Sequence, residues 1–362
     1  MSKVKVGVIG CGKISDIYLT NITGMHSDIL EIAAISDLNL SVAKTRAEQY
    51  SIPDILSVDE FYKSDKYDIV INLTIPKAHY SVCKEALLNG KHVYTEKPLS
   101  IKYSESVELM ELAKSKGLVI AGSPDTFMGA SAQTARKAID DGLIGEPVAA
   151  TAFMLCHGWE QFHPNPDFYY AKGGGPMFDM GPYYLTALIN LLGPAKEVCG
   201  MYSNPIKHRE IVVGPRKGEA LPIEIPTHVA GNILFKNGVI ATVITTFDVW
   251  PTEMPHILIY GTKGTLIVPN PDHFGDPVKL RIGDNERLID LPLLNKYNVN
   301  SRGIGICDMA LAIKEKRMAR TDSKMASHVL EIMEAFHRSQ TEKKHIQLRS
   351  ECVQPAPFYG KI

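Results

Sequence analysis

The sequence lacks the features that tie proteins to nucleic acids or membranes. Its 362 residues include 39 Lys and Arg against 40 Asp and Glu, so the formal net charge is −1, and basic residues form only short clusters such as Lys343-Lys344. The N-terminus has no apolar segment and cleavage site of the signal-peptide kind, and no stretch is apolar enough to span a bilayer. We therefore expect a cytoplasmic protein with neither nucleic acid nor membrane as partner.

Cysteine is too scarce and too scattered to suggest a disulfide framework or a metal cluster. The six cysteines form no C-x-x-C pair, which favours reduced thiols. Cys156, His157 and His163 are close in sequence, but their spacing fits no usual zinc pattern. We therefore expect no metal site.

The N-terminal third alternates strand and helix patterns, which predicts a parallel sheet covered by helices on both faces. A chain of 362 residues is also long enough to predict two domains. The expected strands are Val4–Ile9, Leu30–Ser36, Asp68–Leu73, Lys91–Thr95 and Leu118–Ala121, and the expected helices are Lys13–Ile22, Ser41–Tyr50, His79–Leu88 and Tyr103–Lys116.

The pattern changes after about residue 125, so we place the domains at 1–125 and 126–362. The second domain is expected to be α+β, with an open, mostly antiparallel sheet. Its expected strands are Val148–Leu155, His228–Phe235, Val239–Phe247, His256–Tyr260, Thr265–Val268 and Leu280–Ile282, and its expected helices are Ala132–Asp141, Ile304–Lys316 and Lys324–Arg338. Asn237-Gly238 predicts a tight hairpin. An open sheet leaves one broad face to bury, which predicts a homodimer or homotetramer.

A glycine-rich turn follows the first strand. Gly10, Gly12, Lys13, Ile14 and Ser15 match the strand-G-x-G-x-x-(small)-helix pattern, with Ser15 in place of the third glycine. The glycines allow a tight turn and a close backbone approach to a pyrophosphate, whose charge is favoured by the helix N-terminus. Because the strand and the helix are both present, we interpret the turn as a dinucleotide site rather than a purely structural turn.

Asp37 ends the second expected strand, 25 residues after Gly12. A carboxylate at this position accepts hydrogen bonds from the adenosine ribose and repels a 2′-phosphate, which favours NAD over NADP as cofactor. The alternative is that Asp37 only caps the following helix.

Glu96-Lys97-Pro98 follows the strand that ends at Thr95, at the edge where doubly wound sheets bind cofactor and substrate. The chain resembles the Gfo/Idh/MocA oxidoreductases, a family named for glucose–fructose oxidoreductase and inositol dehydrogenase. The resemblance rests on this tripeptide together with Gly10 and Gly12, Pro76 and His79 after Thr74, and the segment from Gly173 to Tyr183. The resemblance extends over essentially the whole chain. It implies an N-terminal Rossmann domain that binds NAD(P) and a C-terminal open sheet that binds a sugar or cyclitol.

The resemblance also implies roles for individual residues. Lys97 corresponds to the catalytic lysine and Asp179 to the acidic residue of a D-x-G-x-H motif, in which Tyr183 replaces the usual histidine. The glucose–fructose oxidoreductase branch also has a tyrosine at that position. Thr74, Pro76, His79, Glu96 and Lys97 are then expected beside the cofactor.

The identity of the acid/base group stays open. A phenol with an ordinary pKa near 10 needs the Lys97 ammonium nearby before Tyr183 acts as a base. Lys97 itself is a second candidate, and His157 and His163 are further ones. Asp179 is expected to orient the substrate or Lys97, unless it only caps the helix that follows it.

A loop from His157 to Tyr170 is rich in aromatic and polar residues. Flat rings together with hydrogen-bonding groups suit the apolar faces and hydroxyl rim of a pyranose, so we expect His157, Trp159 and His163 to bind substrate along with Lys97, Asp179 and Tyr183. The alternative is that these rings fill a domain interface.

The sequence thus predicts an NAD-dependent oxidoreductase that transfers hydride between nicotinamide and a secondary alcohol of a sugar, glycoside or inositol. Its partner is then a small polyol or glycoside. Two alternatives stay open: a catalytically silent regulator that binds a dinucleotide, and a reductase of a non-carbohydrate carbonyl compound.

Overall fold

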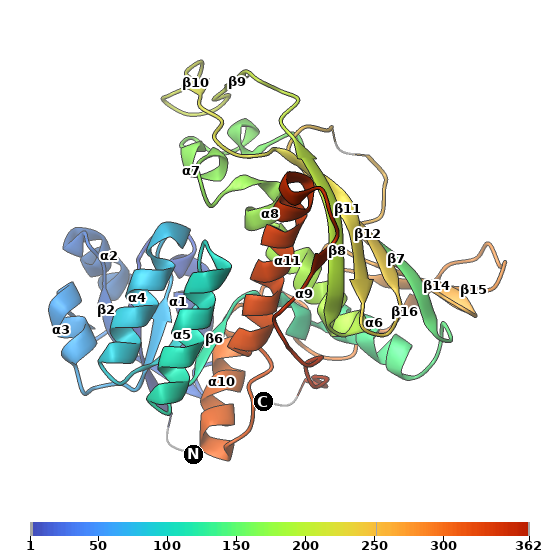
Figure 1. Ribbon diagram of the computed structural model, residues 1–362. Coiled ribbons are helices and arrows are strands. Elements are labelled where there is room, and N and C mark those ends of the chain that lie inside the picture. The colour runs from blue at the N-terminus through green and yellow to red at the C-terminus, as the bar shows by residue number, and fades with distance from the viewer. Residues whose placement is uncertain (1–2, 251, 361–362) are drawn as a thin grey trace. The chain divides into compact units, whose positions relative to one another are not determined.

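The structure is a computed structural model that describes residues 3–250 and 252–360. The chain forms two compact units (Figure 1). The first runs to Met128 and also includes Val299–Ser327 and Gly360, and the second comprises Gly129–Asn298 and His328–Tyr359.

The first unit contains a six-stranded parallel sheet in the order β3-β2-β1-β4-β5-β6. Its strands are β1 Val4–Ile9, β2 Leu30–Ser36, β3 Asp54–Ile55, β4 Ile69–Asn72, β5 His92–Thr95 and β6 Ile120–Gly122. Its helices are α1 Ser15–Thr23, α2 Leu40–Tyr50, α3 Val58–Lys63, α4 Pro76–Leu88, α5 Tyr103–Ser115 and α10 Ile304–Glu315, and the 3₁₀ turn η1 spans Thr126–Met128. This doubly wound sheet confirms the predicted α/β fold.

Two apolar clusters cover the two faces of this sheet. One includes Val6 and Val8 of β1 with Tyr18 of α1, and the other includes Val70 of β4 with Leu87 of α4. The strand order reverses between β1 and β4, because β2 and β3 lie on one side of β1 while β4 to β6 lie on the other. Such a switch point places a crevice at the carboxyl ends of the strands, where doubly wound folds bind ligands.

The predicted domain boundary needs one correction, because residues 299–327 belong to the first unit rather than the second. Ile306, Met309 and Ala310 of α10 are buried in the same apolar cluster as β1 and α1. In the sequence α10 follows the last strand predicted for the second domain, and its apolar stripe does not indicate which core it joins.

The second unit is built on a nine-stranded sheet in the order β16-β15-β14-β13-β7-β12-β11-β8-β17. These strands are β7 Pro147–Leu155, β8 Ala195–Ser203, β11 His228–Phe235, β12 Ile240–Thr246, β13 Ile257–Gly261, β14 Gly264–Val268, β15 Val278–Ile282, β16 Ile289–Leu291 and β17 Ile346–Gln347. Only the β7–β12 pair is parallel, and β11 and β12 join at the predicted Asn237-Gly238 hairpin. The expected open, mostly antiparallel sheet is thus confirmed.

Helices cover one face of this sheet. The helical segments of the second unit are α6 Ala130–Asp140, η2 Trp159–Gln161, α7 Asp167–Tyr170, α8 Gly175–Asp179, α9 Gly181–Leu192 and most of α11 Ser323–Glu342. Val229, Ala241 and Val243 point to the covered face and are buried, while Met201 and Ile240 are exposed on the other. A separate two-stranded sheet, β9 Arg209–Glu210 with β10 Ala220–Leu221, lies in the excursion between β8 and β11.

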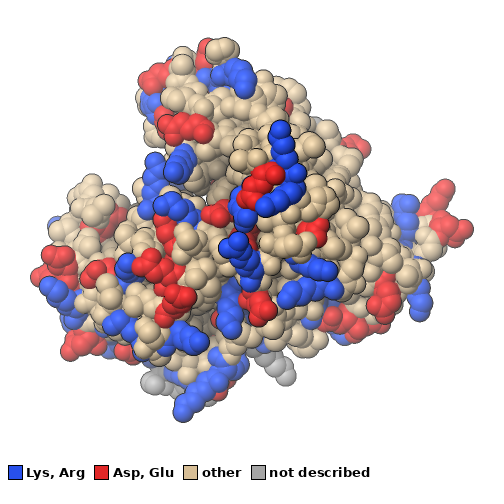
Figure 2. Space-filling view, viewed as in Figure 1, with Lys and Arg blue, Asp and Glu red and all other residues tan. Residues whose placement is uncertain are grey.

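The molecular surface mixes charges of both signs. Figure 2 shows Lys and Arg interspersed with Asp and Glu over the visible face of each unit. None of the helices in the described part of the chain is long and apolar enough to cross a membrane. All six cysteines are free thiols.

Candidate functional site

The glycine turn after β1 lies at the switch point of the first sheet. Gly10 has a φ of +96°, and a Cβ on it would lie 2.6 Å from the backbone carbonyl carbon of Leu73. Gly12 is exposed, and a Cβ on it would meet no protein atom within 4 Å. The protein itself therefore requires glycine at position 10 but leaves open space beside position 12.

Helix α1 starts directly after this turn. It has no side-chain cap at its N-terminus, and the buried Ser15 donates its hydroxyl to the carbonyl oxygen of Gly12 (2.7 Å). Lys13 is exposed and Ile14 half-buried. An uncapped helix N-terminus after an open glycine backbone suits an anionic ligand.

Asp37 follows β2 and ties two turns together. Its Oδ2 accepts a hydrogen bond from the amide N–H of Cys11 (2.8 Å), and its Oδ1 accepts one from the amide N–H of Asn39 (2.8 Å). Asn39, rather than Asp37, is the N-cap of α2. The helix-cap alternative for Asp37 is therefore wrong, and its half-buried carboxylate lies beside the glycine turn.

Thr74 and Pro76 follow β4, at the same edge of the sheet. Thr74 donates its hydroxyl to Asn72 Oδ1 (2.6 Å), and Pro76 is the first residue of α4. His79 is fully buried, with Nδ1 2.6 Å from the carbonyl oxygen of Pro98 and Nε2 3.0 Å from that of Thr74. Burial lowers the pKa of His79, while the two carbonyl oxygens act in the opposite direction. Both ring nitrogens of His79 thus face backbone carbonyl oxygens. Any effect of His79 on a cofactor is therefore indirect, through the positions of the Thr74 and Pro98 backbones.

Glu96 and Lys97 follow β5. The Glu96 carboxylate is buried and accepts a hydrogen bond from the Tyr18 hydroxyl of α1 (2.6 Å) and another from the Lys97 amide N–H (2.8 Å). Glu96 thus connects the helix of the glycine turn to the backbone of Lys97. The Lys97 side chain is half-buried at the carboxyl edge of the sheet. The sequence did not reveal the Tyr18 contact, because 78 residues separate Tyr18 from Glu96.

Asp179 and Tyr183 lie at the junction of α8 and α9 in the second unit. Asp179 is the last residue of α8, and Met180 is the N-cap of α9, so the helix-cap alternative for Asp179 is wrong. Tyr183 lies in the first turn of α9 and is 7% exposed. Trp159 donates its indole N–H to Asp179 Oδ2 (2.8 Å). The structure thereby brings a predicted substrate residue of the loop into contact with the predicted acidic residue.

The two loop histidines make other contacts. The His157 ring stacks on Trp250, with ring centroids 3.6 Å apart. Nδ1 of His163 accepts a hydrogen bond from the Asn165 amide N–H (3.1 Å). The His163 ring lies edge-on to the rings of Phe168 and Tyr169. Within the described ranges, no group of three or more His, Cys, Asp or Glu side chains could hold a metal ion.

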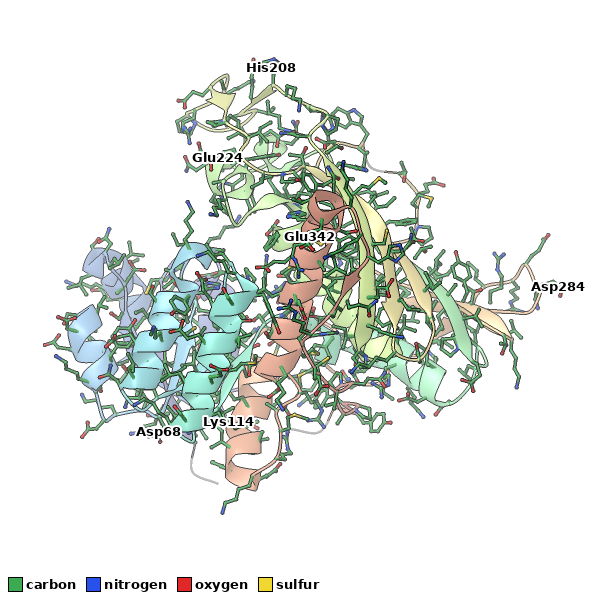
Figure 3. All side chains as sticks on the ribbon, in the orientation of Figure 1. Asp68, Lys114, His208, Glu224, Asp284 and Glu342 are labelled. Atoms are coloured by element: carbon green, nitrogen blue, oxygen red, sulfur yellow. The ribbon has the colours of Figure 1, made fainter. Side chains whose placement is uncertain are left out.

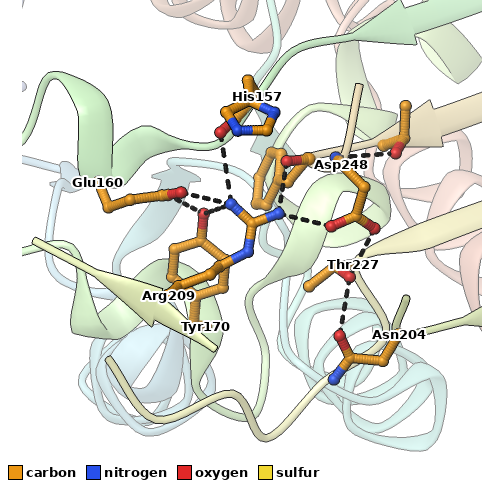
Figure 4. A network of polar contacts seen from close by, with 9 residues as sticks. His157, Glu160, Tyr170, Asn204, Arg209, Thr227 and Asp248 are labelled. Atoms are coloured by element: carbon orange, nitrogen blue, oxygen red, sulfur yellow. Dashed lines mark hydrogen bonds and ion pairs between the residues drawn. The ribbon is translucent and has the colours of Figure 1, made fainter. Parts of the chain in front are cut away.

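A buried ionic network that the sequence analysis missed lies behind this loop (Figure 4). Arg209 of β9 forms ion pairs with Glu160 and Asp248, and the Tyr170 hydroxyl donates to Glu160. Arg209 is 5% exposed and Glu160 2%. The one sequence signal that could have revealed the network is a charged Arg209 in a short strand-like pair, which is too weak to separate from a surface arginine.

Comparison with known proteins follows the division into two units. Residues 4–122 match the family model described as "Oxidoreductase family, NAD-binding Rossmann fold", and residues 132–267 match the "GFO/IDH/MocA C-terminal domain". The chain belongs to the Gfo/Idh/MocA oxidoreductase family. The predicted resemblance is therefore confirmed.

Relatives of this Gfo/Idh/MocA protein include enzymes of sugar metabolism. It is 29% identical over 197 residues to a D-glucoside 3-dehydrogenase of Escherichia coli, covering 53% of this chain and 55% of that protein. It is 24% identical over 298 residues to a dTDP-3,4-didehydro-2,6-dideoxy-alpha-D-glucose 3-reductase of Streptomyces antibioticus, covering 80% of this chain and 84% of that protein. The chain spans only 54% and 64% of the length of two further curated relatives it matches.

The fold also matches solved structures. Levoglucosan dehydrogenase in complex with NADH and levoglucosan has a TM-score of 0.82 and 19% identity, covering 96% of this chain and 99% of that chain. At this identity the likeness shows the fold alone.

The first unit of this Gfo/Idh/MocA protein fits a dinucleotide. Open space beside Gly12, the uncapped N-terminus of α1 and the carboxylate of Asp37 lie at the switch point of one sheet. The helix N-terminus supplies amide donors and open space for a pyrophosphate, and the carboxylate supplies an acceptor for the hydroxyls of an adenosine ribose.

Proposed function

We propose that this protein is an NAD-dependent dehydrogenase that acts on a secondary alcohol of a sugar, a glycoside or an inositol. The observation that carries the proposal is the Asp179 carboxylate, which accepts a hydrogen bond from the Trp159 indole beside a loop rich in aromatic rings. A carboxylate next to flat apolar rings matches the hydroxyl groups and C–H faces of a cyclic polyol. Its sugar-dehydrogenase and sugar-reductase relatives support the same substrate class.

We propose NAD rather than NADP as cofactor. Gly10 to Ile14 would hold the pyrophosphate through their backbone, and Asp37 would accept the ribose hydroxyls. The Asp37 carboxylate would repel a 2′-phosphate. Thr74, Pro76, Glu96 and Lys97 follow neighbouring strands at the same edge of the sheet and would line the rest of the cofactor site.

The division of labour among the side chains follows from their chemistry. When bound, the nicotinamide accepts the hydride from the carbinol carbon. Lys97 donates a hydrogen bond to the reacting oxygen and favours its alkoxide form, since an ammonium stabilises negative charge there. Asp179 accepts a hydrogen bond from a substrate hydroxyl and so orients the ring, and Tyr183 relays the proton of the reacting hydroxyl to solvent water.

The test is NAD reduction, followed at the nicotinamide absorbance, across a panel of hexoses, glycosides and inositols. We expect turnover within one polyol class, with NADP at least about tenfold less effective than NAD. Absence of turnover on every polyol despite NAD binding would contradict the proposal and favour a catalytically silent regulator. Oxidation of NADH by a non-carbohydrate carbonyl compound alone would favour a reductase of that class.

A further inference from the structure

We propose that Arg209 is a positioning residue whose guanidinium fixes Trp159 against Asp179 and so sets the shape of the substrate loop, which we define as residues 157–170. The inference rests on the proposed function, because that function assigns Asp179 to substrate binding. Arg209 acts through Trp159 rather than on the substrate itself.

Arg209 lies in an unusual place for a buried charge. It belongs to β9, in the excursion between β8 and β11 that also carries His208 and Glu224 (Figure 3). The Arg209 side chain is only 2% exposed, as against 33% for Arg216 in the same excursion. A buried guanidinium is costly unless its donors are paired, so the contacts it makes determine why it is there.

The guanidinium of Arg209, which belongs to β9, binds two other segments of the chain (Figure 4). Nη1 donates to the carbonyl oxygen of His157 (3.3 Å) and to the Glu160 carboxylate, both in the substrate loop. Nη2 donates to the carbonyl oxygen of Phe247 (2.7 Å) and to Asp248 Oδ1 (2.5 Å), at the end of β12. One side chain thus ties the loop to the sheet through both backbone and side-chain acceptors.

These contacts surround Trp159. His157 and Glu160 lie on either side of it in the chain, and both are bound by Nη1 of the same guanidinium. The Phe247 ring packs edge-on against the Trp159 ring, with centroids 6.2 Å apart, and its carbonyl oxygen is bound by Nη2. The backbone around the indole and one ring that it packs against are therefore both held by Arg209.

The loop packs closely on this guanidinium at Gly158. Its φ is +92°, and a Cβ on it would lie 2.6 Å from Arg209 Nη1. Glycine is thus needed both for the backbone conformation and for the space beside the guanidinium.

The two carboxylates are themselves fixed by neutral donors. The Tyr170 hydroxyl donates to Glu160, and the Thr227 hydroxyl donates to Asp248 Oδ2 (2.7 Å). A planar guanidinium can bridge two such carboxylates and two carbonyl oxygens at once, whereas a lysine ammonium is a single point charge. Arg209→Lys therefore keeps the charge but loses the bridge.

The first readout uses the only two tryptophans of the chain, Trp159 and Trp250. In a Trp250→Phe background, Trp159 is the sole source of tryptophan fluorescence. We expect Arg209→Lys to shift its emission to longer wavelength and to increase its quenching by acrylamide, because the indole becomes mobile. Arg317→Lys is the matched control, since Arg317 also pairs with two carboxylates, Asp308 and Glu315, but is partly exposed and belongs to the first unit. It is expected to leave the emission of Trp159 unchanged.

The second readout is a double-mutant cycle on the alcohol oxidation. We expect Arg209→Lys and Trp159→Phe each to lower kcat/KM for the polyol by about tenfold while the Kd for NAD changes less than about twofold. We expect the kcat/KM of the double variant to equal that of the less active single variant, because Arg209 acts through Trp159. Effects that multiply to about a hundredfold would overturn the proposal, as would unchanged Trp159 fluorescence in a folded Arg209→Lys protein.

The two readouts separate this inference from the proposed function. If no polyol is oxidised, the proposed function fails, and the Trp159 fluorescence of Arg209→Lys against Arg317→Lys still decides whether Arg209 holds the loop. If Arg209→Lys does not fold, Asp248→Asn replaces it, because this substitution removes one charge partner of Arg209 and keeps an oxygen acceptor. We expect it to change the Trp159 fluorescence and kcat/KM in the same direction. Asp248→Asn with wild-type fluorescence and kcat/KM would then overturn the proposal.

Discussion

Gly10 and Gly12 are two residues apart, yet the structure requires glycine only at position 10. Gly10 has a positive φ and lies against the backbone of Leu73 and Thr74. Gly12 has neither constraint, because it is exposed and a Cβ would meet nothing within 4 Å. The packing of the protein therefore does not require glycine at position 12, whereas close approach of a pyrophosphate to this backbone would.

Alanine substitution distinguishes the two glycines. Gly10→Ala should lower the free energy of unfolding by about 2 kcal/mol or more, through the clash and the unfavourable φ. Gly12→Ala should change it by less than about 0.5 kcal/mol while weakening NAD binding at least about tenfold. Thermal melts and calorimetric NAD titration measure both effects. NAD binding of wild-type strength in Gly12→Ala would mean that the cofactor does not approach this backbone.

Asp37 is expected to set the choice between NAD and NADP. Asp37→Asn removes the charge but keeps one oxygen acceptor, so the ratio of the NADP Kd to the NAD Kd should fall by about tenfold. Because the carboxylate also binds the Cys11 and Asn39 amides, loss of one acceptor should cost about 1 kcal/mol of stability. Asp54→Asn, at a surface pair with Lys66, is the control. An unchanged ratio in Asp37→Asn would show that another group selects the cofactor.

At the residue scale, the sequence predicts the position of a residue where that position follows from local order. Asp37 directly follows strand β2, and the glycine turn lies between β1 and α1, so both positions are predictable from the sequence. Arg209 is different, because its partners Glu160 and Asp248 are 49 and 39 residues away, in the short 3₁₀ helix η2 and just after β12. No periodicity connects such positions, so the network is visible only in the folded chain.

At the scale of elements, periodicity predicts which elements exist better than where they begin. Helix α4 begins at Pro76 rather than His79, because a proline is well accommodated in the first turn, where its missing N–H costs nothing. Strand β8 was missed entirely. Its sequence contains Lys196, Glu197 and Gly200, which interrupt any apolar run, yet Gly200 is needed where the strand packs closely on Phe336.

Helix α11 carries a titratable link to β8. Nε2 of His328 accepts a hydrogen bond from the amide N–H of Ala195 (3.0 Å), and Nδ1 of the same ring lies 2.6 Å from the Ser350 hydroxyl oxygen. An imidazolium has no acceptor, so protonation breaks the bond to Ala195. Burial lowers the pKa of His328 from its ordinary value of 6.5 to about 4.

This shift has a definite sign in the stability of the protein. Between about pH 6.5 and 4 the unfolded chain binds a proton at His328 that the folded chain does not, so stability is fully present above pH 6.5 and falls as the pH is lowered. We expect His328→Gln to lose about 3 kcal/mol less than the wild type between pH 7 and 4. Urea unfolding at both pH values measures this difference. Parallel losses in the two proteins would contradict the role of His328.

At the scale of the whole chain, the order of elements along the sequence is not the order of domains. Residues 299–327 return to the first unit because Ile306 and Met309 complete the core beside β1 and α1. The amphipathic pattern of α10 predicts a helix, but either core could accept its apolar stripe. The two fold classes were therefore predictable, while the membership of this segment was not.

We propose that the open face of the second sheet pairs copies of the chain. Met201 of β8 and Ile240 of β12 lie on that face and are 73% and 53% exposed. Replacing both by lysine should shift a dimer or tetramer toward smaller species in light scattering, because charges oppose burial of an apolar face. Met318→Lys, at an exposed methionine of the first unit, is the control. A monomeric wild type, or an unchanged mass in the double variant, would contradict this pairing.

Lys97 carries the central claim, since the proposed chemistry depends on an ammonium at the reacting oxygen. The direct test is the initial rate of NAD reduction by Lys97→Ala on the polyol that the wild type oxidises, beside Lys102→Ala, whose side chain is 55% exposed and pairs with Glu105. We expect Lys97→Ala to lose about a thousandfold in kcat while its Kd for NAD stays within about threefold, and Lys102→Ala to match the wild type. A Lys97→Ala protein that oxidises the polyol at the wild-type rate would contradict the proposed function.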